Sequence, residues 1–230
     1  MQDDKILSIR VFGSVARKEN NEGSDLDILI VSEKNEFIPE IIKESFQQHK
    51  NVEFSTYSRS RLEEMFNEGH LFAWHLYLES IPAENDPGNN WFSELGAPNP
   101  YKEANIDLTQ FLLILDESTD AINTDSDYIF EAGMIYLCLR NIGMILSYLD
   151  AGLPNFSKYS ALELPLKIRP SISKESYDFL ILCRRISARG NTSDAPTKNI
   201  IFSIFAEIKN WSITIKEQFP CRDLKDSGIE

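Results

Sequence analysis

The amino-acid sequence predicts an α+β fold, in which a small mixed β-sheet with flanking helices is followed by an all-α helical bundle. Two observations lead to this prediction. Short apolar runs bounded by turn residues, typical of strands, fill the first part of the chain, whereas apolar residues later recur at helical spacing. A break rich in Pro, Gly and Asn, residues 82–100, separates the two patterns. We therefore expect a sheet domain over 1–95, a helical domain over 100–219 and a flexible tail over 220–230.

Strands alternate with short helices in the first part. Residues 5–12 (KILSIRVF) predict a strand that stops at Gly13 and Ser14, and a short helix over 15–19 follows. The apolar run 26–31 (LDILIV) predicts a strand buried on both faces. The remaining expected elements are a helix after Pro39, a strand over 52–57, a helix begun by the capping-box pair Ser60 and Glu63 and ended near Gly69, and an amphipathic stretch over 70–79.

Four amphipathic helices are expected beyond the break. Their apolar residues recur at i, i+3, i+4 and i+7, and we find no convincing strand among them. The expected helices cover 106–120, 128–149, 174–188 and 198–218. The apolar face of 134–149 fits either the core of the bundle or the seam of a homodimer, and the sequence leaves both open.

Composition narrows the class of protein. The chain has 230 residues with 23 Lys and Arg against 36 Asp and Glu, a net charge of −13, which disfavours a surface that grips long nucleic acid. Its three cysteines are odd in number and form no CxxC pair, so neither a disulfide framework nor a zinc cluster is indicated. An acidic N-terminus and the absence of a long apolar run indicate neither a signal peptide nor a membrane span, and we expect a cytoplasmic protein.

The residues that could take part in catalysis lie at a turn after the first strand and on the next two predicted strands. A turn at Gly13 and Ser14, between a strand and a helix, exposes backbone N–H groups and a hydroxyl that suit a phosphate. Asp25 and Asp27 lie two apart on a predicted strand, so their carboxylates project from one face and can share Mg²⁺. A pair of Mg²⁺ ions normally needs a third carboxylate, and Glu53 on the polar side of the next strand is the candidate.

This pattern resembles that of a known family. Gly13-Ser14, Ala16-Arg17 and Ser24-Asp25-Leu26-Asp27 before an apolar strand resemble the GS…SDxD signature of the DNA polymerase beta-like nucleotidyltransferases, especially the minimal ones. The resemblance implies an NTP substrate, with ATP expected, held by the Gly-Ser turn, and two Mg²⁺ ions bound by Asp25, Asp27 and Glu53, the expected catalytic residues. The nucleotide-binding residues expected on this basis are Gly13, Ser14, Arg17, Lys18 and Ser24.

The resemblance extends into the second half of the chain, and the sequence differs from the family pattern at two positions. Residues 71–79 and the later helices resemble family members with a HEPN-like or kanamycin-nucleotidyltransferase-like bundle. Lys18 stands where many relatives have Gly, and Glu53 where Asp is usual. Arg17 and Lys18 fit either phosphate contact or a solvated surface, and His75 is expected to be a packed core residue. Ribonuclease activity of the helical half is not expected, because the three histidines all precede that half.

The function implied is transfer of an NMP from an NTP to a hydroxyl acceptor by Mg²⁺-dependent two-metal chemistry. The negative charge favours a cationic small molecule such as an aminoglycoside as acceptor. Two alternatives stay open: nucleotidylation of a protein or a tRNA, as in toxin–antitoxin systems, and a non-catalytic module that binds a nucleotide or a protein. Arg184, Arg185 and Arg189 could contact an anionic ligand or pair with nearby acids.

Overall fold

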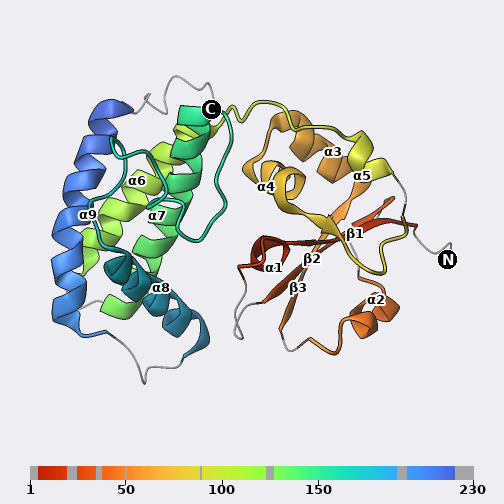
Figure 1. Cartoon of the computed structure of the whole chain (residues 1–230), viewed down its shortest axis with the longest axis horizontal. Coiled ribbons are helices and arrows are strands. Elements are labelled where there is room, and N and C mark those ends of the chain that lie inside the picture. The colour runs from red at the N-terminus through yellow and green to blue at the C-terminus, as the bar shows by residue number, and fades with distance from the viewer. Residues whose placement is uncertain are drawn as a thin grey trace. The chain divides into compact units, whose positions relative to one another are not determined.

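The computed structural model describes residues 5–19, 25–34, 38–49, 51–88, 90–122, 127–190 and 196–220 (Figure 1). The chain divides into two compact units, residues 1–102 and 103–230. The first unit holds a mixed sheet with short helices, and the described part of the second is helical, which confirms the α+β fold class.

The sheet of the first unit has the strand order β3-β2-β1-β4. The bounds of the strands are β1 Ile6–Phe12, β2 Leu26–Ser32, β3 Val52–Ser58 and β4 Ile81–Pro82. β1 pairs antiparallel with β2 and with β4, whereas β2 and β3 run parallel. The central strand β2 is buried on both faces, as its unbroken apolar run predicts.

Short helices cover both faces of this sheet. Their bounds are α1 Gly13–Ala16, α2 Glu40–Ser45, α3 Arg59–Glu68, α4 Leu71–Glu79 and α5 Trp91–Glu94. Leu29 and Val31 pack on one face with residues of α3, α4 and α5, while Ile28 and Ile30 pack on the other with residues of α2 (Figure 1). The alternation of side chains along β2 therefore sets which face carries Asp27, namely that of Leu29.

One sequence expectation for this unit needs correction. The N-cap of α3 is Ser58, whose hydroxyl accepts from the backbone N–H of Arg61 at 3.4 Å, and not Ser60 of the predicted capping box. The break at 82–100 belongs to the first unit, where Phe92 of α5 lies in the core. Helix α3 ends at Gly69 as predicted, with the left-handed φ of 72° that favours glycine.

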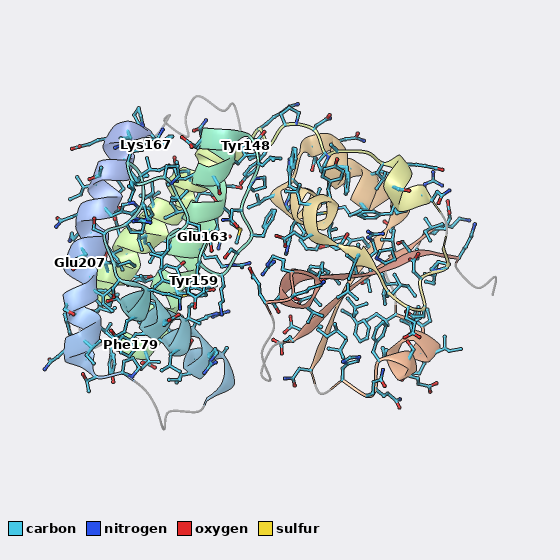
Figure 2. All side chains as sticks on the ribbon, in the orientation of Figure 1. Tyr148, Tyr159, Glu163, Lys167, Phe179 and Glu207 are labelled. Atoms are coloured by element: carbon cyan, nitrogen blue, oxygen red, sulfur yellow. The ribbon has the colours of Figure 1, made fainter. Side chains whose placement is uncertain are left out.

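The second unit contains four long helices among its described residues. They are α6 Ala104–Ala121, α7 Tyr128–Ala151, α8 Lys174–Arg189 and α9 Lys198–Gln218, close to the ranges that the periodicity predicts. α7 packs against α6 and α8, and Figure 2 shows the side chains between these helices. α7 is long and apolar enough to meet the length and composition test for a membrane span, but 61% of its most apolar window is buried inside the unit.

Close backbone packing holds this helical unit together. A Cβ on Gly143 of α7 would stand 2.4 Å from the backbone nitrogen of Ala161, so the segment after α7 lies directly against the helix. Cys138 of α7 and Cys183 of α8 are buried, and burial raises the pKa of each thiol to about 12. Neither thiol is a reactive nucleophile at neutral pH.

Candidate active site

The end of β1 brings a glycine turn against an aspartate. Gly13 follows β1 with a φ of 70°, and Phe12 before it pairs with Asp27 on β2. A Cβ on Gly13 would stand 2.2 Å from Oδ2 of Asp27, which is far inside van der Waals contact. Only glycine therefore lets this turn carry a positive φ and leave room for the carboxylate. Gly13 and Asp27, both predicted site residues, therefore lie directly against each other.

Register places the other two carboxylates around Asp27. Asp27 pairs with Glu53 of β3 in the parallel ladder, and Asp25 lies two residues earlier on the same side of the chain. Asp25 and Asp27 are partly buried, and Glu53 is exposed. Among the described residues, no group of three or more His, Cys, Asp and Glu side chains is close enough to hold a metal ion. Asp27 and Glu53 thus lie side by side on adjacent strands, as expected. Binding of a metal ion by Asp25, Asp27 and Glu53 together stays a prediction.

An ion-pair cluster ties the turn to α4. Nη1 of Arg17 lies 2.6 Å from Oε2 of Glu79, and its Nε lies 2.9 Å from Oε2 of Glu19. Nε2 of His75 also lies 2.9 Å from Oε2 of Glu79. The side chains of Arg17, His75 and Glu79 are each only about 15% exposed. Of the two roles left open for Arg17, a freely solvated surface position is excluded, and His75 is a packed residue, as expected.

The pKa values in this cluster follow from its hydrogen bonds. Burial alone would raise the pKa of the Glu79 carboxyl, but hydrogen bonds with His75 and Arg17 hold it below its ordinary value. Burial alone would likewise lower the pKa of Arg17, but its hydrogen bonds to Glu19 and Glu79 raise it. Glu79 therefore stays ionised at neutral pH and fixes the guanidinium. Glu79 was not among the expected site residues, although it is the last residue of the segment 71–79 that resembles the family.

Part of the chain matches a known protein family. Residues 1–71 match the family model of the nucleotidyltransferase domain. The N-terminal unit is therefore similar, over these residues, to a nucleotidyltransferase domain. The whole chain is also similar to a solved structure, spectinomycin adenyltransferase AAD(9) from Enterococcus faecialis with ATP and spectinomycin. That similarity has 15% sequence identity, a TM-score of 0.42, and coverage of 90% of this chain and 93% of that chain. No curated protein matches the chain.

Lys18 stands at a position where many relatives have glycine, and its backbone conformation is one that glycine favours. Its φ is 60°, and it is the only non-glycine residue with a positive φ in the described part of the chain. The turn closes with hydrogen bonds from the N–H of Lys18 to the carbonyl of Val15 and from the N–H of Glu19 to that of Ser14. A position that needs the left-handed region suits glycine, so the lysine is accommodated here at some strain.

The structure describes some of the remaining candidate site residues and not others. Ser14 is partly buried in α1, beside Gly13. Ser24 lies outside the described residues. Arg184 is partly buried and Arg185 is exposed on α8, and neither forms an ion pair with the residues that the structure describes. Their anion-contacting role, and that of Arg189, therefore stay hypotheses about the helical unit.

Proposed function

We propose that this protein transfers an NMP from an NTP, with ATP as the expected donor, to a hydroxyl group of an acceptor. The observation that carries the proposal is the contact of Gly13 with Asp27 inside a nucleotidyltransferase domain. Since a phosphate-binding turn and a carboxylate meet at one point, triphosphate oxygens and a divalent cation can be held side by side there.

The residues at this point fit a divalent metal. Asp27 on β2 and Asp25 just before that strand provide hard carboxylate oxygens, which are the ligand type that Mg²⁺ prefers. The missing Cβ of Gly13 keeps the Oδ2 side of Asp27 clear of a steric overlap. When bound, Mg²⁺ would neutralise the phosphate charge and polarise the phosphorus that is attacked.

Each side chain of the site has a role in the proposed reaction. The Gly13 turn and the Ser14 hydroxyl bind the β- and γ-phosphates, while Asp25 and Asp27 would hold the divalent metal ion. Glu53 is exposed at the register position of Asp27, so its carboxylate can position an acceptor hydroxyl or accept its proton. The acceptor oxygen bonds to the α-phosphorus as the bond to pyrophosphate breaks.

The acceptor class is inferred from charge. A net charge of −13 attracts a cationic small molecule, such as an aminoglycoside, more than it attracts a nucleic acid. Incubation with radiolabelled ATP and Mg²⁺, followed by mass spectrometry, distinguishes the acceptors. A gain of one NMP on an amino sugar supports this proposal, and a gain on a protein or a tRNA end replaces it with the nucleotidylation alternative.

The site itself is tested without knowledge of the acceptor. The thermal unfolding midpoint is measured with ATP, GTP, CTP and UTP, with and without Mg²⁺. A ligand at about 100 times its Kd stabilises the fold by about 2.7 kcal/mol, which such an assay detects. We expect one nucleotide to shift the wild type only with Mg²⁺, and the Asp25→Asn/Asp27→Asn variant to lose that shift.

A matched control separates metal binding from a change in net charge. Glu40→Gln/Glu44→Gln removes two acids from the exposed surface of α2 and should keep the nucleotide shift. An equal response of both double variants would contradict the metal site. Binding of a nucleotide that is indifferent to Mg²⁺ would favour the non-catalytic module.

A further inference from the structure

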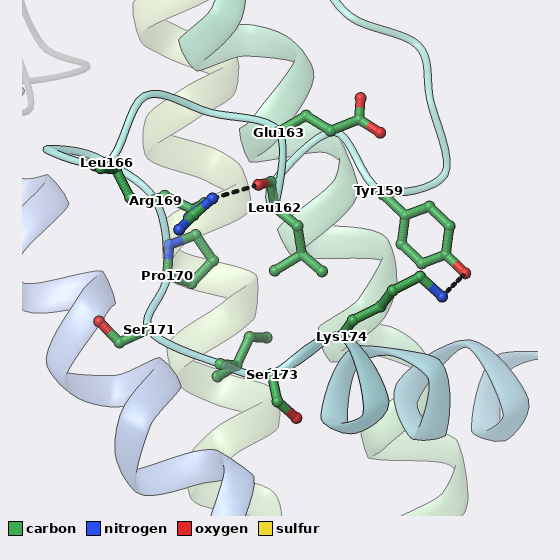
Figure 3. Close-up of a pocket in the computed structure, with 10 residues that line it drawn as sticks. Tyr159, Leu162, Glu163, Leu166, Arg169, Pro170, Ser171, Ser173 and Lys174 are labelled. Carbon is green, nitrogen blue, oxygen red and sulfur yellow. Dashed lines mark hydrogen bonds between the residues drawn. The ribbon is translucent and has the colours of Figure 1, made fainter.

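The helical unit contains a cavity that the proposed transfer reaction does not use. It has a volume of about 710 Å³ and lies between the segment after α7 and the start of α8 (Figure 3). Cavities of about 300–1,000 Å³ are typical of small-molecule sites. All its lining residues belong to the unit 103–230, whereas Gly13 and Asp27 belong to the unit 1–102. The cavity therefore shares no lining residue with the proposed nucleotide site.

One part of the lining is apolar. Leu162, Leu166, Pro170 and Ile172 contribute hydrocarbon surface to the cavity. Leu166 is 81% exposed, the largest exposed fraction among the large apolar side chains that the structure describes. Covering such a side chain stabilises a complex by about 25 cal/mol for each Å² removed from water. A ligand with an apolar body would therefore gain free energy here.

The charged groups of the lining differ in how far they are already paired. Lys174 donates to the Tyr159 hydroxyl at 3.2 Å and to Asp178 at 3.0 Å. The Glu163 carboxylate accepts from Asn155 at 2.6 Å and from Ser157 at 2.9 Å. Figure 3 shows that this carboxylate points away from Arg169. Neither Lys174 nor Glu163 therefore has a charge that lacks a polar partner.

Arg169 is the exception in this lining. Its Nη1 donates to the carbonyl of Leu162 at 3.4 Å, and within the described part of the chain it forms no ion pair (Figure 3). A guanidinium has five N–H donors in a planar fork, so several remain for a carboxylate, sulfonate or phosphate. The hydroxyl of Ser171 lies on the same lining and can donate a further hydrogen bond, whereas that of Ser173 already donates to Oγ of Ser176 at 3.0 Å. The cavity lining thus combines apolar surface with one cationic group, the Arg169 guanidinium, that can bind an anion.

We propose that this cavity binds a small organic anion, with the anionic group on Arg169 and an apolar body against Leu162, Leu166 and Ile172. A single available cation fits one negative charge, and it does not fit a nucleoside triphosphate, which carries several. The ligand class is therefore distinct from the substrate of the nucleotidyltransferase domain. The site gives the helical unit a binding function of its own.

A pair of dyes tests this assignment. 1-Anilinonaphthalene-8-sulfonate has an aromatic body with one sulfonate, and N-phenyl-1-naphthylamine has the same body without the anion. Fluorescence titrations of the full chain should show saturable binding of the sulfonate at one site per chain, with the uncharged dye binding at least about tenfold more weakly. Saturating ATP with Mg²⁺ should leave the sulfonate bound, because the cavity shares no lining residue with the proposed nucleotide site and has a single available cation.

Variants assign the binding to the cavity. Arg169→Gln should weaken the sulfonate dye about tenfold and leave the uncharged dye unchanged, whereas Leu166→Ala should weaken both. Lys167→Gln is the matched control, because Lys167 has the same charge, pairs with Asp150 and does not line the cavity. Far-ultraviolet circular dichroism confirms that each variant folds. The proposal is overturned if no saturable site exists, if Arg169→Gln behaves like Lys167→Gln, if both dyes bind alike, or if ATP displaces the sulfonate.

Discussion

Gly13 shows how one missing methyl group shapes the site. Its backbone has a φ of 70°, and the space where a Cβ would lie is taken by the Asp27 carboxylate. Conformation and contact therefore both require glycine, and either alone would disfavour a substitution. The neighbouring Lys18 has a similar φ without being glycine, so the same short turn holds one residue that fits its conformation and one that does not.

Gly13→Ala is expected to abolish the Mg²⁺-dependent nucleotide shift and to destabilise the fold by at least about 1–2 kcal/mol, the cost of a left-handed non-glycine residue. The added methyl group would also displace Oδ2 of Asp27. Urea unfolding gives the stability, and thermal shifts with ATP and Mg²⁺ give the binding. A variant that retains the full shift would show that the carboxylate position does not matter.

Lys18→Gly is expected to raise the free energy of unfolding by about 1 kcal/mol, because glycine removes the strain of the positive φ. Lys18→Ala removes the same charge but keeps the strain, so it should give no gain. Urea unfolding of both variants against the wild type makes the comparison. Equal stabilisation by both substitutions would attribute the effect to charge instead.

Glu79→Gln is expected to destabilise the fold at neutral pH by about 1–3 kcal/mol, since a charged acceptor of hydrogen bonds is lost. The pKa of Glu79 is lower in the folded protein than in the unfolded chain. Its contribution is thus present above the unfolded value of about 4.3 and is lost as the pH falls through the folded value. Unfolding measured from neutral to acid pH should show a smaller loss on acidification in the variant. Parallel curves would contradict this linkage.

At the scale of elements, local contacts decide where helices begin. Helix α3 is capped by Ser58, the last residue of β3, because the chain passes from strand to helix with no intervening loop. The predicted pair Ser60 and Glu63 lies inside the helix instead, where Glu63 accepts from Arg59 at 2.8 Å. A capping-box pattern alone therefore placed the boundary two residues late.

Ser58→Ala is expected to cost about 1 kcal/mol of stability, the usual effect of removing an N-cap hydroxyl. Ser60→Ala, two residues into the sequence of α3, should change stability by less than about 0.5 kcal/mol. Thermal and urea unfolding of the two variants distinguish the two caps. A larger loss from Ser60→Ala would restore the capping box.

At the scale of the whole molecule, the two units differ in how they are built. The first buries a sheet between helices, while the second packs α7 against α6 and α8, with close backbone approaches to α8 at Gly133 and to the segment after α7 at Gly143. A Cβ on Gly133 would stand 3.0 Å from the Cα of Arg184, so α7 and α8 lie in direct contact. The long apolar α7 is accounted for by this packing.

The buried thiols report on the helical unit. In a Cys221→Ser variant, Cys138 and Cys183 are expected to resist Ellman's reagent in the native protein and to react after denaturation, because burial raises the pKa of each to about 12. The absorbance of released thionitrobenzoate counts the reactive thiols. Rapid native labelling of either cysteine would show that α7 and α8 open readily.

Much of the fold could be predicted because it depends on local patterns. The apolar run of β2 and the helical periodicity of α6 to α9 are properties of neighbouring residues, so they are readable along the chain. β4 and α5 are too short to have a period, and they form because β1 offers an edge and the core accepts Phe92.

For the site, the residue types were evident from the sequence and their arrangement was not. Gly13, Asp25 and Asp27 follow from a motif whose spacing reflects one turn and one strand. The strand pairing of Asp27 with Glu53 and the ion pair between Arg17 and Glu79 join residues far apart in the chain. Such contacts depend on strand register and on the packing of α4, which only the tertiary structure decides, because many distant partners are compatible with the same local pattern.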